Sequence, residues 1–184
     1  MNKYILGSFL AALAFFLWGY LYWAVSPLPK SIIHTSPDGD AAGAMLKQMF
    51  PNDGMYTVPG MSLDEETRHA HHEAGPIATV HIKHAGAPAM TAKYFIVGFA
   101  HCWVSALLLT FLLVKASPAV LASYGSRVWF VTLTGVAIAV VSDFSFPVYW
   151  GHPWPVYILN AVHIIGGVLV TGLVLAKFVK PAQT

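Results

Sequence analysis

The sequence predicts an all-α membrane protein, in which a bundle of four transmembrane helices carries a small extracytoplasmic α+β cap between helices 1 and 2. Three observations lead to this fold class. The 184 residues are 57% hydrophobic and only 10% charged, whereas a soluble domain has about 25% charged residues. Four apolar runs approach the roughly 20 residues with which a helix crosses the hydrocarbon core. A long polar segment, residues 26–93, contains seven of the eight acidic residues.

Residues 1–25 are expected to form the first span and to act as an uncleaved signal anchor. The apolar run 4–25 is longer than the apolar core of about 7–15 residues that a cleaved signal peptide has. Its end, Ala24-Val25-Ser26, is a poor cleavage site, and Pro27 follows it directly. Aromatic residues crowd the far end of this run, as they do at a membrane interface.

Residues 26–93 are expected to form the cap. The spacing of apolar residues predicts a helix over residues 38–50. Two short runs, 54–60 and 76–84, are candidate strands that could pair with each other. The segment has too few large apolar residues for a core of its own. We therefore expect a compact cap that is seated on the membrane helices.

A second helix of the cap, over residues 63–74, is predicted by the capping-box spacing of Ser62 and Glu65. On this helix Glu65, His69 and His72 fall at positions i, i+4 and i+7 of one face. That set could bind zinc or copper in the cap, and the alternative is a solvated, histidine-rich helix face. Further metal-ligand candidates are His71, which points elsewhere, and His81 and His84, which fall on opposite faces of a strand.

Three further spans follow the cap. Lys115 closes the second span and Arg127 opens the third, as charges do at the ends of membrane helices. Pro147 is expected to stop the third helix, and Pro155 suits the first turn of the fourth. The expected boundaries are helix 2 at 94–115, a cytoplasmic loop at 116–127, helix 3 at 128–147, an outer aromatic turn at 148–155, helix 4 at 156–178 and a cytoplasmic tail at 179–184.

The basic residues predict the orientation. Five of them lie in short segments on one side of the bundle, namely Lys3, Lys115, Arg127, Lys177 and Lys180. Because positive charges in short loops mark the cytoplasmic side, we expect both termini in the cytoplasm of a bacterium and residues 26–93 in the periplasm. The lipid bilayer of the inner (cytoplasmic) membrane is then the main partner, with another membrane-complex subunit or a second copy as the expected protein partner.

Composition also excludes some classes of protein. The net charge is only +2, and the basic residues do not cluster as they would along a phosphate backbone, so nucleic acid is not an expected partner. The single cysteine, Cys102, excludes an internal disulfide. Signatures of hydrolases, metalloproteases, P-loop proteins and Rossmann domains are absent from the sequence.

Polar residues gather in the outer parts of the last three spans. His101 and His163 each lie seven residues inside a span, so both are expected about 10 Å below the outer surface at 1.5 Å per residue. Asp143 and Asn160 lie closer to that surface. Polar groups inside a span usually face the bundle interior or a cavity. We therefore expect the two imidazoles to share one layer, and Asp143 would have to reach inward to hold one of them.

Three interpretations of this layer stay open. The first is an interhelical hydrogen-bond network. The second is one b-type haem with His101 and His163 as axial ligands, for which Gly98, Gly166 and Gly167 would leave room. The third is a quinone or proton site that uses His163, Asp143 and Tyr157.

The nine histidines all lie on the expected outer side or in the outer part of a span. This one-sided distribution predicts a non-catalytic accessory or metal-binding subunit with a histidine-rich periplasmic face. The alternative is an electron-transfer or quinone-linked membrane protein that binds one b-type haem between helices 2 and 4.

Overall fold

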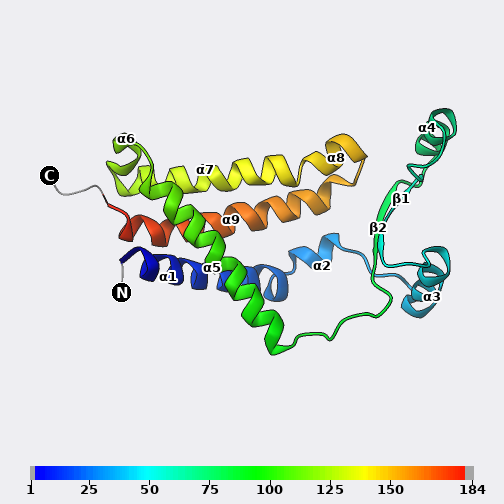
Figure 1. Cartoon of the computed structure of the whole chain (residues 1–184), viewed down its shortest axis with the longest axis horizontal. Coiled ribbons are helices and arrows are strands. Elements are labelled where there is room, and N and C mark those ends of the chain that lie inside the picture. Colours follow the sequence, from blue (N-terminus) through cyan, green and yellow to red (C-terminus); the bar gives the residue numbers. More distant parts are fainter. Residues whose placement is uncertain (1–2, 181–184) are drawn as a thin grey trace.

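The computed structural model describes residues 3–180, and most of this chain is helical (Figure 1). Within this range, four helical stretches are long and apolar enough to cross a membrane. They are Lys3–Val25, Ala92–Val114, Tyr124–Trp150 and Trp154–Phe178. The sequence-based expectation of four helices of membrane-spanning length is therefore confirmed.

The first stretch is α1 (Lys3–Tyr20), which continues as the π-helical turn η1 (Leu21–Val25), and the short α2 (Leu28–Ile32) follows it. The second stretch is α5 (Ala92–Val114), from which α6 (Pro118–Leu121) leads into the third. The third comprises α7 (Tyr124–Ser142) and α8 (Ser145–Trp150), and the fourth is α9 (Trp154–Phe178).

The helices pack in the order α7, α9, α1, α5. Figure 1 shows α9 between α7 and α1, with α5 crossing the bundle obliquely. Helix α9 has α7 on one side and α1 on the other, and α5 lies mainly against α1. This order differs from the one that the haem alternative requires, in which a cofactor lies between the second and fourth spans. Lipid tails give no hydrophobic drive to helix association, so the neighbours of each helix depend on how closely its surface fits another.

Close fit is visible at the glycines of α9 and α7. A Cβ atom added to Gly167 would lie 2.2 Å from Phe15, and one added to Gly166 would lie 2.3 Å from Trp18. These aromatic rings of α1 occupy the space that the two glycines leave. On the other side of α9, a Cβ atom on Gly135 would lie 2.7 Å from the Cβ of Val168. Glycine therefore allows the close approach of α1 and α7 to α9.

Arg127 holds the opposite end of the bundle together. Its side chain is only 6% exposed. Its Nε donates a hydrogen bond to the carbonyl of Ala176 on α9 (3.1 Å), and its Nη1 donates to the carbonyl of Leu121 in α6 (2.6 Å). Because buried charges need such partners, the residue that marks the start of a span in the sequence also links three helices.

The long polar segment contains α3 (Gly39–Met49), β1 (Gly54–Val58), α4 (Glu65–Ala74) and β2 (Ala78–Ile82). The two strands pair antiparallel, with Thr57 opposite Thr79. The expected helices and strands are thus present, but the compact cap is not. Between residues 26 and 93 only Pro29 is buried, and α3 and α4 extend beyond the end of the bundle (Figure 1).

Several helix ends differ from those expected. Asp64, not Ser62, caps α4 through a hydrogen bond from the backbone N–H of Thr67 (2.9 Å). Pro147 lies in the first turn of α8 and does not end a helix, because a proline in a first turn removes no intrahelical hydrogen bond. Local capping groups decide these ends, and hydrophobic runs locate them only to within a few residues.

Gly135→Ala is expected to lower the apparent stability of the bundle by about 1–3 kcal/mol, the usual cost of an overpacked core position. The new methyl group would meet the β-branched Val168, which has little freedom to move aside. The matched control is Gly98→Ala in α5, where the added Cβ would lie 3.5 Å from Phe16, an ordinary contact. Thermal unfolding in detergent should separate the two variants, and equal midpoints would contradict the packing described for α7 and α9.

Candidate functional site

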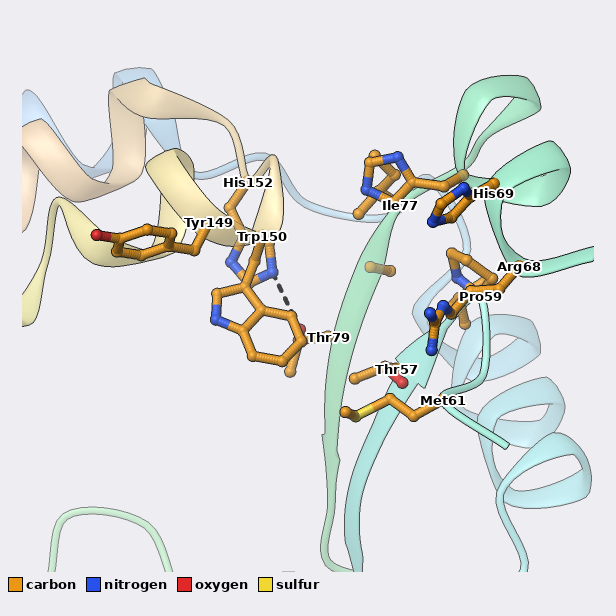
Figure 2. Close-up of a pocket in the computed structure, with 13 residues that line it drawn as sticks. Thr57, Pro59, Met61, Arg68, His69, Ile77, Thr79, Tyr149, Trp150 and His152 are labelled. Carbon is orange, nitrogen blue, oxygen red and sulfur yellow. Dashed lines mark hydrogen bonds between the residues drawn. The ribbon is translucent and has the colours of Figure 1, made fainter. Parts of the chain in front are cut away.

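A cleft of about 380 Å³ lies between the polar segment and the turn that joins α8 to α9 (Figure 2). The hairpin contributes Thr57 and Thr79 to its lining, and α4 contributes Arg68 and His69, which Figure 2 shows on the side away from the turn. The α8–α9 turn supplies the opposite side. The basic residues of the lining are Arg68, His69, His72 and His152, and its larger apolar residues are Val58, Met61, Ile77, Tyr149 and Trp150.

Helix α4 has a defined residue at each end, and its basic residues Arg68, His69 and His72 line the cleft. The carboxylate of Asp64 accepts the hydrogen bond from Thr67 N–H, and this bond lowers the pKa of Asp64 below its ordinary value. Gly75, at φ 67°, ends the helix, since a positive φ suits glycine. Arg68 and His72 lie four residues apart and therefore share one helix face.

His152 joins the polar segment to the membrane bundle. Its Nε2 lies 3.0 Å from Thr79 Oγ1 on β2, and its Nδ1 lies 2.5 Å from the hydroxyl of Tyr157 on α9. The imidazole also stacks on Phe146, with ring centres 5.7 Å apart and planes 18° apart. Both ring nitrogens thus have partners, and the side chain is fixed in one orientation.

Gly151 lets the turn approach the hairpin closely. Its φ is 66°, and an added Cβ would lie 3.3 Å from Ile77 and 3.9 Å from His72 Nε2. A side chain here would be strained by the backbone conformation and would also enter the cleft. His152 belongs to the turn expected at residues 148–155, but the sequence pattern does not indicate Thr79, Gly151 or this contact. The one signal that the sequence offers here is a glycine, Gly151, between Trp150 and His152.

Polar groups continue from His152 into the membrane region. Asp143 is 9% exposed, accepts a hydrogen bond from Ser142 Oγ (3.0 Å), and interacts electrostatically with Tyr157 and His163. Asn160, also on α9, is half-buried and makes no hydrogen bond with its side chain in the described part of the chain. No hydrogen bond joins Asp143 to His163 among residues 3–180, so a site shared by these two residues stays a prediction.

His163 lies between α9 and α1, where aromatic rings surround it. Its ring centre is 5.3 Å from that of Tyr22, 5.4 Å from Trp23 and 6.1 Å from Phe15. Its Nε2 is buried and has no hydrogen-bond partner among residues 3–180. Tyr22 and Trp23 belong to the π-helical turn η1, and π-helical turns often occur at functional sites.

His101 does not meet His163. It is exposed on α5, on the stripe that also carries Val97, Val104 and Leu108, which are 56–61% exposed. Helix α5 packs on α1, and the aromatic side chains around His163 come from α1 and η1. The two imidazoles therefore do not face each other as haem ligands would, and Phe15 and Trp18 fill the space at Gly167 and Gly166.

The expected metal ligands are also distributed differently. His69 and His72 line the cleft, whereas Glu65, His71, His81 and His84 do not. His84 lies at the far end of the hairpin, where its Nε2 donates a hydrogen bond to the carbonyl of Phe50 (2.7 Å). Residues 3–180 contain no group of three or more His, Cys, Asp or Glu side chains that could hold a metal ion. The Glu65, His69 and His72 stripe is thus not assembled as a metal centre in this structure.

No family model matches the chain, and comparisons with curated proteins and with solved structures find no match. What the protein does is therefore inferred from its own residues and their geometry.

Thr79→Val is expected to loosen the hairpin from the α8–α9 turn, because valine keeps the shape of threonine but cannot bond to His152. Thr57→Val is the matched control: Thr57 pairs with Thr79 across the hairpin and lines the same cleft, yet its side chain makes no hydrogen bond among the described residues. Hydrogen exchange of the β2 amides should rise in Thr79→Val and stay unchanged in Thr57→Val. Equal exchange in the two variants would show that His152 does not hold the hairpin.

Asp64→Ala is expected to increase hydrogen exchange in the first turn of α4, because Thr67 N–H loses its partner. The pKa of Asp64 is lowered in the folded chain. The stabilisation by the Asp64 carboxylate is therefore complete above the ordinary carboxyl pKa of about 4. It is lost as the pH falls through the lowered pKa. Asp38→Ala, which removes the corresponding cap of α3, should leave α4 unchanged. Equal hydrogen-exchange protection of α4 in the wild type and in Asp64→Ala at pH 7 would refute the capping role of Asp64.

Proposed function

We propose that this chain is a non-catalytic, multi-pass membrane protein that binds a ligand in the cleft at its outer end and acts there as an accessory subunit of a membrane complex. In this proposal residues 26–93 and the α8–α9 turn face the periplasm of a bacterium, and both termini lie in the cytoplasm. The observation that carries the proposal is the convergence of Arg68, His69, His72 and His152 on one cleft, although they come from two separate parts of the sequence.

The position of the cleft supports this role. It lies where the polar segment meets the bundle, and His152 reaches both Thr79 and Tyr157. A ligand between the two parts would add contacts to each of them and so stabilise the docked arrangement. Any change in docking would also act on α9, because Tyr157 belongs to that helix.

The side chains of the cleft are suited to binding. The guanidinium of Arg68 and the imidazoles of His69 and His72 can donate hydrogen bonds, and Trp150 and Tyr149 provide amphipathic aromatic surface. A few polar groups among apolar and aromatic walls are typical of small-molecule sites. The cleft volume of about 380 Å³ is within the usual range of roughly 300–1,000 Å³ for such sites.

A metal-binding role is the second candidate. The observation that favours it is that His69, His72 and His152 line the same cleft, and imidazoles suit zinc and copper. Because these side chains are not close enough to hold an ion together, His69 and His72 would have to move toward His152 on binding, and His152 would have to release Thr79 or Tyr157. The exposed side chains of His69 and His72 make no hydrogen bond among the described residues, so they are available to do so.

A ligand of the cleft is expected to raise the unfolding temperature of the purified full-length protein in detergent. Binding at 100 times the dissociation constant stabilises by about 2.7 kcal/mol. We would test Zn²⁺, Cu⁺ and a series of small organic ions against the wild type, His72→Ala and Trp150→Ala, with His81→Ala and Trp154→Ala as controls that lie outside the lining. The proposal expects a shift that is lost only in the two cleft variants.

A ligand whose effect survives both cleft substitutions would place binding elsewhere. If no compound in any of these classes stabilised the wild type, the binding role itself would be refuted.

A further inference from the structure

We propose that the ligand of this cleft is an oxyanion, specifically a phosphate group, carried on an apolar body. This inference rests on the proposed binding role and names its ligand class. An anionic lipid of the surrounding membrane and a free amphiphilic phosphate share this chemistry.

The charge of the cleft is the first argument. Its lining contains one arginine and three histidines, and none of the described lining residues is acidic. Glu65 shares a helix face with His69 and His72 but is exposed and lies outside the lining. The cleft therefore combines several groups that are cationic or can become so, without a carboxylate to neutralise them.

Arg68 is the second argument. Its side chain is half-buried in the lining, and in the described part of the chain it makes no hydrogen bond or ion pair. A guanidinium carries five N–H donors in a planar fork that matches the oxygens of a phosphate or carboxylate. An oxyanion in the cleft would give these donors partners, and protonated His69 or His72 would add charge-assisted bonds.

The opposite wall is the third argument. Trp150 and Tyr149 lie on the side of the cleft that belongs to the bundle, whereas Arg68 and His69 lie on the far side (Figure 2). Trp150 and Tyr149 belong to α8, at the end of a membrane-spanning stretch, where aromatic residues typically mark the level of lipid headgroups. A molecule with its phosphate toward α4 and its apolar part toward α8 would match both walls.

The choice of phosphate over carboxylate follows from the number of donors. A phosphate presents three or more oxygens, whereas a carboxylate presents two. The guanidinium can engage two oxygens at once, and the imidazoles of His69 and His72 line the same cleft. A phosphate can therefore use donors from both residue types at the same time.

The test uses the full-length protein in neutral dodecyl maltoside micelles, titrated with dodecyl phosphate and separately with inorganic phosphate, with tryptophan fluorescence as the readout. Arg68→Gln should weaken binding of dodecyl phosphate by at least about tenfold, the usual effect of losing a charge-assisted hydrogen bond. Lys47→Gln removes one positive charge from exposed α3, outside the cleft, and should leave the affinity unchanged. Arg68→Lys should restore only part of it, because lysine lacks the fork.

The two sources of the phosphate are separated in nanodiscs of phosphatidylcholine that contain a small fraction of phosphatidic acid. Retention of phosphatidic acid by the wild type and its loss in Arg68→Gln, measured by native mass spectrometry, would identify a lipid headgroup. If the wild type and Arg68→Gln retain phosphatidic acid equally, while binding of dodecyl phosphate still depends on Arg68, the ligand is a free amphiphile.

Three results would overturn the inference: equal affinity of Arg68→Gln and wild type, an equal loss in Lys47→Gln, or inorganic phosphate that binds as tightly as dodecyl phosphate. If phosphate fails but Zn²⁺ or Cu⁺ binds in a manner that depends on His72, the phosphate inference fails and the binding role of the cleft survives. If neither class binds, both fail.

Discussion

The position of the polar segment depends on the hydrogen bonds of His152. The polar segment, residues 26–93, buries only Pro29, so it has no core that could fix its own position. His152 attaches this segment to the bundle, because its two ring nitrogens pair with Thr79 and Tyr157. Phe146 also stacks on its ring. The cleft exists because this attachment brings α4 and the hairpin beside Trp150.

The bundle itself is constrained by shape. Rings of α1 fill the space above Gly166 and Gly167, and Val168 meets Gly135. This packing encloses His163 within aromatic side chains and leaves its Nε2 without a partner in the described chain. The consequence is that His163 is enclosed at the α1–α9 interface, whereas His101 is exposed on α5.

The sequence was sufficient to predict the features that depend on local composition. Four apolar runs gave the four spans, and turn residues with β-branched runs gave a hairpin whose strands occur at Gly54–Val58 and Ala78–Ile82. It could not predict which helices are neighbours, because the depth of His101 and His163 says nothing about the directions in which their side chains point. Nor could it predict the cleft, whose central contact joins Thr79 to His152, 73 residues apart. Such contacts arise from tertiary packing, which a periodic pattern does not record.

The central claim is that the α8–α9 turn lies against the hairpin and α4 in the folded protein. Photo-cross-linking from position 150 measures this contact directly. With p-benzoylphenylalanine in place of Trp150 in the full-length protein, digestion and mass spectrometry should find cross-links to peptides within residues 54–82. Cross-links confined to lipid, detergent or the membrane helices would show that the polar segment does not dock there, and would contradict the account of the cleft.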